Sequence, residues 1–138
     1  MKKLVRRSLA IAGTAVFATT ALWTTASPAS AATYNGACGS GYSVLGSDNV
    51  GQLGTVFLTY NDSTGQNCVV TIRNNPGQPV TWMNAGVRLS GDPGSAVEDP
   101  GHYTTYAGPV YLQAAGKCVD WSGTISNENG GAVDSFCG

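Results

Sequence analysis

The chain has 138 residues, of which 42% are hydrophobic and 11% charged, with 19 glycines and four cysteines. Four of the seven basic residues lie in the first seven positions, whereas all eight acidic residues lie after residue 31. Residues 32–138 therefore carry three basic side chains against eight acidic ones, a net charge of −5. This balance excludes a basic phosphate-binding face and with it ordinary nucleic-acid binding. The length predicts one domain.

Residues 1–31 have the pattern of an export signal. Four positive charges are followed by an apolar stretch that ends in small residues, and Ala29 and Ala31 fit the A-x-A pattern of signal-peptidase cleavage. Threonines interrupt the apolar stretch, which is shorter than the ~20 residues of a membrane-spanning helix. The sequence therefore predicts a signal peptide over 1–31, a secreted domain over 32–138, and no membrane span.

The four cysteines, Cys38, Cys68, Cys118 and Cys137, all lie after the predicted signal peptide. An even number of cysteines in a small exported chain indicates disulfides. Three pairings are possible, and the sequential pairing, Cys38–Cys68 with Cys118–Cys137, is favoured. A metal site explains the cysteines less well, because the chain has no CxxC motif and only one histidine. We expect two structural disulfides and no metal or cofactor.

Glycine and proline break residues 32–138 at short intervals and leave no room for long helices. Residues 55–60 alternate with a period of two, residues 61–65 are rich in turn formers, and the β-branched run 68–73 is the expected return strand. Residues 110–113 and 117–121, joined by a tight turn, resemble a second copy of this hairpin. The likeness has two explanations, which are duplication and independent use of the same hairpin pattern.

Further short strands are expected at five places, with turns between them. They are residues 42–45, 80–83, 86–89, 103–106 and 132–136. The total of about eight short strands is typical of an all-β fold, a small disulfide-bonded antiparallel β-sandwich or barrel.

Catalytic candidates are few. His102 is the single histidine, and no GxSxG motif accompanies it. Residues 91–95 faintly resemble the sequence around the nucleophilic serine of trypsin-like proteases, but proline occupies the place of the nucleophile. Glu98 and Asp99 are adjacent acids of the kind that catalyse glycoside hydrolysis, and with Asp92 they offer oxygen ligands for calcium. A surface histidine and solvated acids in a loop explain these residues better, so no catalytic residue is expected.

Aromatic side chains provide the remaining candidate site. Their rings pack against sugars or proteins while tyrosine hydroxyls form hydrogen bonds. The candidates for stacking on a ligand are Trp82, Trp121, Tyr103 and Tyr106. The favoured alternative for the two tryptophans is a place in or beside the hydrophobic core.

Several ungapped stretches resemble one known family. They are YNGACGSGY (34–42), GQNCVVTIRNNPG (65–77), YTTYAGPVY (103–111), GKCVDW (116–121) and the terminal Cys137-Gly138. Together they contain all four cysteines and resemble the spore-associated protein A family of filamentous actinomycetes. The resemblance implies a small exported protein found with aerial hyphae and spores, without an established catalytic activity. The family offers no agreed active-site residues, and residues 91–101 match it least.

The combined prediction is a secreted, non-enzymatic domain that associates with the surface of spores, aerial hyphae or cells. Only 11 of residues 32–138 are charged, which favours adsorption to a wall or to other surface components over life in free solution. One alternative is an inhibitor of an extracellular protease that presents residues 91–101 as a loop. The other is a carbohydrate- or cell-wall-binding module that uses the aromatic side chains. The expected partners are spore or cell-wall components, including a secreted protein or a polysaccharide.

Overall fold

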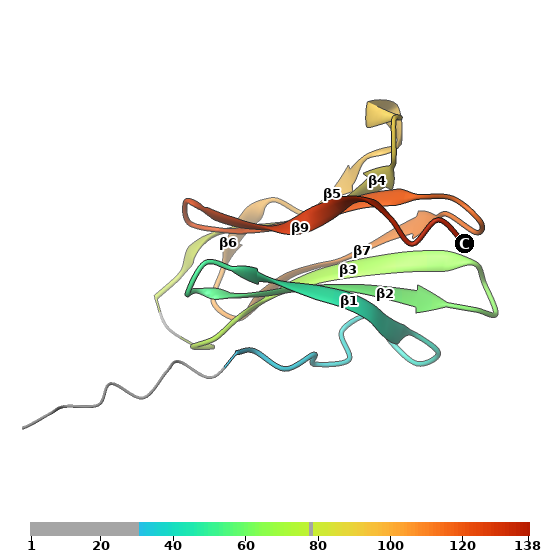
Figure 1. Cartoon of the computed structure of the whole chain (residues 1–138). Helices are drawn as coiled ribbons and strands as arrows, with labels where there is room; N and C mark the ends of the chain where they lie inside the picture. The colour runs from blue at the N-terminus through green and yellow to red at the C-terminus, as the bar shows by residue number, and fades with distance from the viewer. Residues whose placement is uncertain (1–30, 78) are drawn as a thin grey trace, which may run out of the picture.

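The computed structural model describes residues 31–77 and 79–138, so the predicted signal peptide lies outside the described residues except for Ala31. The described chain forms two packed antiparallel sheets (Figure 1). Sheet A contains, in order, β1 (Ser43–Val50), β2 (Gly54–Asn61), β3 (Gln66–Arg73) and β7 (Tyr106–Gln113). Sheet B contains, in order, β5 (Val97–Glu98), β4 (Thr81–Leu89), β8 (Val119–Ile125) and β9 (Glu128–Ser135), and β6 (Gly101–Tyr103) also pairs with β4. The predicted all-β sandwich is confirmed.

Two predicted sets of strands differ from the structure. Residues 80–83 and 86–89 belong to one strand, β4, because Asn84 and Ala85 continue the alternation between its two faces. Residues 103–106 do not form one strand, because the chain turns between β6 and β7. The carbonyls of Thr104 and Thr105 accept hydrogen bonds from the Gly77 and Arg73 amides, 3.0 Å in both cases.

The predicted second hairpin is wrong. β7 pairs with β3 in sheet A, whereas β8 pairs with β4 and β9 in sheet B. The turn at 115–116 therefore carries the chain from one sheet to the other, and the two segments are not copies of one hairpin. The first predicted hairpin does form, with β2 paired to β3 along its whole length. A strand–turn–strand pattern has the same local sequence in both situations, so local pattern does not distinguish them.

The main hydrophobic core lies between the two sheets. Side chains alternate along each strand, so every second residue points inward. Complete burial of one aliphatic or aromatic side chain stabilises the fold by roughly 1.5–3 kcal/mol. The buried members include Val56, Leu58, Val69, Met83, Ala85, Val87, Trp121 and Ile125.

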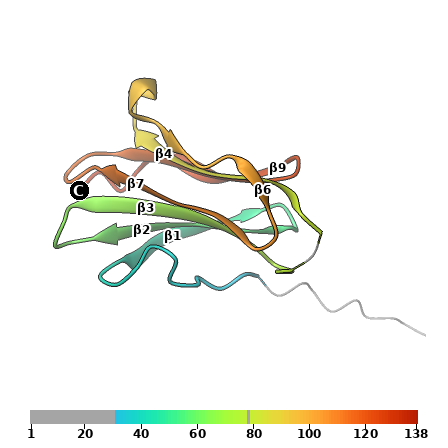
Figure 2. The ribbon, with the colours of Figure 1, turned by 180° about the vertical axis from the view of Figure 1, so that it is seen from behind.

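A second hydrophobic cluster covers the outer face of sheet A, which is the face turned away from sheet B. It is formed where the segment of residues 32–42, which precedes β1, crosses beneath β2 and β3 (Figure 2). As a result, β2 is buried on both faces over almost its entire length. The cluster consists of Phe57, Val70 and Ile72, which pack against Ala32, Tyr34 and Ala37.

The two sheets approach each other closely at Gly123 of β8. A Cβ atom at this position would lie 2.6 Å from Cβ of Val56 and still closer to Oγ1 of Thr71. Thr71 itself is held in place, since its hydroxyl donates to the Asn84 carbonyl at 2.9 Å. Neither neighbour is the far end of a flexible side chain, so a side chain at residue 123 forces the sheets apart.

We expect Gly123→Ala to lower the free energy of unfolding by about 1–3 kcal/mol through overpacking. Ser122→Ala, at the neighbouring exposed position, is the matched control and is expected to change it by less than about 0.5 kcal/mol. Urea denaturation followed by tryptophan fluorescence measures both values. Equal stabilities for the two variants would contradict the proposed contact.

Candidate functional site

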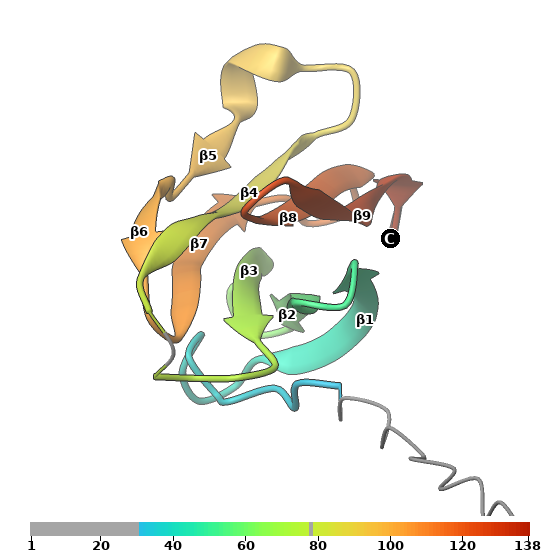
Figure 3. The same cartoon turned by 90° about the vertical axis from the view of Figure 1, so that its left-hand side faces the viewer.

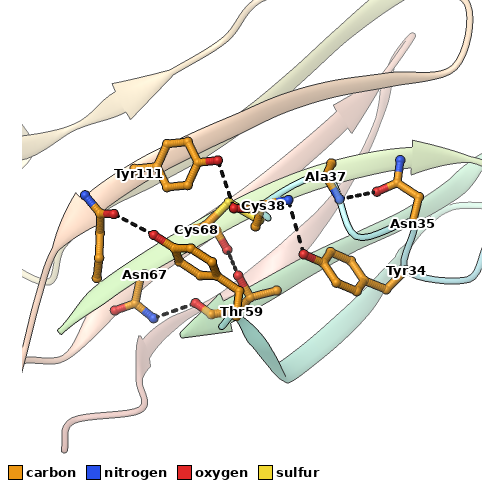
Figure 4. Close-up of a disulfide and its surroundings, with 10 residues drawn as sticks. Tyr34, Asn35, Ala37, Cys38, Thr59, Asn67, Cys68 and Tyr111 are labelled. Carbon is orange, nitrogen blue, oxygen red and sulfur yellow. Dashed lines mark hydrogen bonds between the residues drawn. A yellow bond between two sulfur atoms is a disulfide. The ribbon is translucent and has the colours of Figure 1, made fainter. Parts of the chain in front are cut away.

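The Cys38–Cys68 disulfide fastens residues 32–42 to sheet A (Figure 4). Its Cα atoms lie 6.0 Å apart, and Cys68 is the third residue of β3, on the outer face with Val70 and Ile72. The other disulfide, Cys118–Cys137, joins the C-terminal end of the chain to the residue before β8. The pairing is the sequential one that the sequence favoured.

Tyrosines surround the Cys38–Cys68 disulfide (Figure 4). The Tyr111 hydroxyl donates to the Cys38 carbonyl at 3.0 Å, and the Cys38 amide donates to the Tyr34 hydroxyl at 3.2 Å. The Tyr111 ring also lies 5.7 Å from that of Tyr42. Partial burial raises the pKa of Tyr111 above its ordinary value, so its hydroxyl stays protonated and able to donate at neutral pH. These tyrosines hold the N-terminal segment and are not a free stacking surface.

The four aromatic candidates for ligand stacking do not come together. Trp121 is 5% exposed and belongs to the core, as the alternative interpretation proposed. Tyr103 packs against the same core, and its hydroxyl donates to Oδ1 of Asp99 at 2.6 Å. This carboxylate raises the pKa of Tyr103. Tyr106 is opposite Ile72 on the outer face of sheet A, whereas Trp82 is 44% exposed on the outer face of sheet B.

His102 is an exposed residue of β6. It is opposite Trp82 on β4, and the two rings meet edge to face with their centroids 5.4 Å apart. Ser95, the serine within residues 91–101, forms its hydrogen bonds with residues other than His102. Its hydroxyl donates to the Asp92 carbonyl at 2.7 Å and accepts from the Leu89 amide at 2.8 Å. The structure thus places His102 beside an aromatic ring and gives Ser95 a role in the loop.

The acidic residues of the 91–101 segment point in different directions. Asp92 caps the short 3-10 helix η1 (Pro93–Ser95), with its Oδ1 accepting from Gly94 N at 3.0 Å. Asp99 accepts from the Tyr103 hydroxyl and, at 2.7 Å, from Gly108 N, so it braces the chain against β7. Glu98 lies on the other side, beside Gly86 and Ser122. These three acids therefore do not form a common calcium site.

A hollow of about 630 Å³ lies on the outer face of sheet B. Glycines at 86, 130 and 131 lower the surface along β4 and β9, and Ser122 of β8 lies between them. Glu98 borders the hollow on the β5 side, and Asp48 of β1 borders it on the β9 side, where its Oδ2 accepts from Gly131 N at 2.8 Å. No sequence pattern indicates this hollow, because its residues come from five strands that only the tertiary fold brings together.

An ion pair closes one end of the hollow. Arg88 Nε donates to Asp120 Oδ2 at 2.9 Å, and Asp120 Oδ1 accepts from the Ser90 hydroxyl at 2.7 Å and from Asp134 N at 3.0 Å. The Asp134 amide, the Ser90 hydroxyl and the Arg88 guanidinium hold the pKa of Asp120 below its ordinary value, against the opposing effect of partial burial. Asp120 therefore remains a carboxylate that links β4, β8 and β9.

Two further properties concern the described part of the chain. Over residues 31–77 and 79–138, no group of three or more histidine, cysteine, aspartate or glutamate side chains is arranged to hold a metal ion. The same residues include no helix that has the length and apolar character needed to cross a bilayer.

These features define a disulfide-bonded antiparallel β-sandwich with one outer face covered and the other open to solvent. The chain is 52% identical over 107 residues to spore-associated protein A of Streptomyces coelicolor, an alignment that covers 78% of this chain and 68% of that protein. The chain therefore belongs to the spore-associated protein A family. No family model matches the chain, and no solved structure matches it.

We expect the double substitution Cys38→Ala/Cys68→Ala to release residues 32–42 from sheet A. The disulfide closes a segment of 30 residues, and its loss is expected to lower the free energy of unfolding by about 3–4 kcal/mol. Exposure of Phe57, Val70 and Ile72 is expected to produce binding of a hydrophobic dye. Cys118→Ala/Cys137→Ala is the matched control, which should lose stability without gaining dye binding. Equal dye binding by the two double variants would contradict the role given to Cys38–Cys68.

We expect Asp120→Asn to lower the free energy of unfolding by about 1 kcal/mol at neutral pH, because the substitution weakens hydrogen bonds made to a carboxylate near the surface. Because the folded-state pKa of Asp120 is lowered, its contribution is present above its ordinary pKa of 3.8 and is lost as the pH falls through the folded-state value. The difference in the free energy of unfolding between the variant and the unmodified protein should therefore shrink in acid, as measured by denaturation between pH 2 and 7. Asp62→Asn, in the exposed β2–β3 turn, is the control, and a pH-independent difference would count against this assignment.

Proposed function

We propose that this protein is exported and associates, without catalysing a reaction, with the surface of spores or aerial hyphae. The observation that carries the proposal is the 52% identity to spore-associated protein A over 107 residues. Identity at this level extends across most of the sandwich and therefore supports a shared mode of attachment. The low content of charged residues supports adsorption to a surface.

Export through a leader at residues 1–31 is part of the proposal. Two disulfides support it, because such bonds persist in oxidising compartments outside the cytoplasm. The position of Ala32 supports cleavage just before this residue. Its amide donates to Oδ1 of Asn74 at 2.9 Å and its side chain packs on the second cluster, so the expected first residue of the secreted domain is itself part of the fold.

The proposed absence of catalysis is supported by the surroundings of the residues best suited to chemistry. The His102 ring is in edge-to-face contact with Trp82. The Ser95 hydroxyl forms hydrogen bonds with residues 89 and 92, and the Asp99 carboxylate accepts a hydrogen bond from Gly108 N of β7. A nucleophile needs a base within hydrogen-bonding reach, typically about 2.6–3.2 Å. The three side chains are instead engaged in separate structural contacts.

The proposal is tested by fractionating a sporulating Streptomyces culture that produces the full chain. We expect most of the protein to remain with water-washed spores, to begin at Ala32 by mass spectrometry, and to be released by detergent. The control is residues 1–31 fused to an unrelated secreted reporter, which should accumulate in the medium. Recovery of the full chain in the medium alone would overturn surface association, and retention inside the cells with an intact leader would overturn export.

A further inference from the structure

The outer face of sheet B presents a row of outward-facing residues along β4, with the exposed Trp82 at one end and the half-buried Arg88 at the other. The row consists of Trp82, Asn84, Gly86 and Arg88, because β4 pairs with β8 without a register shift and alternate residues share a face. From Trp82 to Arg88 the row is about 20 Å long, at about 3.3 Å per residue. This length suits a chain-like ligand better than a single small molecule.

The row leads from an aromatic side chain into the hollow. Trp82 is 44% exposed, although its ring is in edge-to-face contact with that of His102. Gly86 lies four residues further along β4, where the hollow begins. On the β5 side, the connection that contains η1 stands above sheet B and forms a raised border (Figures 1 and 3). The hollow of about 630 Å³ falls within the range of roughly 300–1,000 Å³ typical of ligand sites.

The side chains between Trp82 and the ion pair carry hydrogen-bonding groups of both kinds. The Thr124 hydroxyl donates to Oδ1 of Asn129 at 2.8 Å, which orients the amide and leaves its Nδ2 as a donor. Ser122 contributes a hydroxyl that can donate or accept, and the Glu98 carboxylate accepts. Such a mixture of donors and acceptors beside an exposed indole suits a ligand with many hydroxyl groups and an apolar ring face.

The charges bordering the hollow indicate that its ligand is not an anion. Arg88 is paired with Asp120, so its positive charge is already neutralised. Asp48 and Glu98 leave the border with two carboxylates in excess. A phosphate-rich or carboxylate-rich polymer would meet like charges here, which disfavours its binding.

We propose that the outer face of sheet B binds an uncharged hexose polysaccharide, with a sugar ring stacked on Trp82 and the chain continuing over Ser122 beside Glu98. This inference deepens the proposed surface association, on which it rests, by naming the attachment face and the ligand class. Sheet A is less suited to this role, because residues 32–42 cover its outer face over β2 and β3. Of the four aromatic side chains that the sequence offered for stacking, the structure assigns the role to Trp82.

The test uses the purified secreted protein with two uncharged probes, cellohexaose and chitohexaose, and one anionic probe, polygalacturonic acid. Affinities are measured by isothermal titration calorimetry, and retention is measured on insoluble cellulose and chitin. We expect binding to at least one uncharged probe and none to the anionic one. Comparison of the two uncharged probes shows whether an acetamido group is preferred.

Two variants locate the site. Trp82→Ala removes the stacking ring and is expected to weaken binding about tenfold or more. Ser122→Tyr fills the hollow from an exposed β position, where tyrosine is well tolerated, and should abolish binding while Trp82 remains in place. Tyr106→Ala removes an exposed ring from sheet A and is the matched control, with unchanged affinity expected. Circular dichroism and thermal melting establish that each variant is folded.

Binding to neither uncharged probe, preference for the anionic probe, or equal affinity of the Trp82→Ala and Tyr106→Ala variants would each overturn the assignment. The outcome is separable from that of spore association. If the protein remains with spores but binds neither probe, only the polysaccharide site fails. If it binds a probe through Trp82 but is recovered in the medium, only spore association fails.

Discussion

The fold depends on one constraint, the attachment of residues 32–42 to the outer face of sheet A. Phe57, Val70 and Ile72 point away from the main core, and without the N-terminal segment they would face water. Cys38–Cys68 holds the segment near its middle, while the Ala32–Asn74 hydrogen bond holds it at its beginning. A domain of about 107 residues has a limited core, and a second buried layer fixed by a covalent bond compensates for that limit.

This constraint makes the two sheets different. In sheet A, the central strands β2 and β3 are covered on both sides, whereas the edge strand β1 is largely exposed. Sheet B is covered only on the side facing sheet A, and its outer face carries Trp82, Ser122 and the Arg88–Asp120 pair. The asymmetry gives the molecule one face for stability and one face for contact with its surroundings. This division agrees with the proposed surface association, since groups on the outer face of sheet B remain accessible after folding.

Several structural features were predictable because they depend on local or compositional signals. The alternation over residues 55–60 and the turn formers that follow specify the β2–β3 hairpin, and the even cysteine count indicates two disulfides. The β7–β8 hairpin was predicted wrongly, because a short turn between strands does not reveal whether they share a sheet. The sequence could not show which of the two tryptophans is exposed. Trp82 lies on the outer face of its strand and Trp121 on the inner face, and this difference decides their burial.

The sequence by itself determined an all-β, disulfide-bonded chain with a net negative charge after residue 31, because glycine spacing, alternation, cysteine number and charge are properties of the residues themselves. It also carried the family resemblance. The tertiary structure alone decided which face of sheet B stays open, that Glu98 and Asp99 point apart, and that Asp48, Gly86, Ser122 and Gly131 border one hollow. The physical reason is that these placements arise from contacts between residues up to 83 positions apart, as in the hydrogen bond from Gly131 N to the Asp48 carboxylate, and no local pattern encodes such a contact.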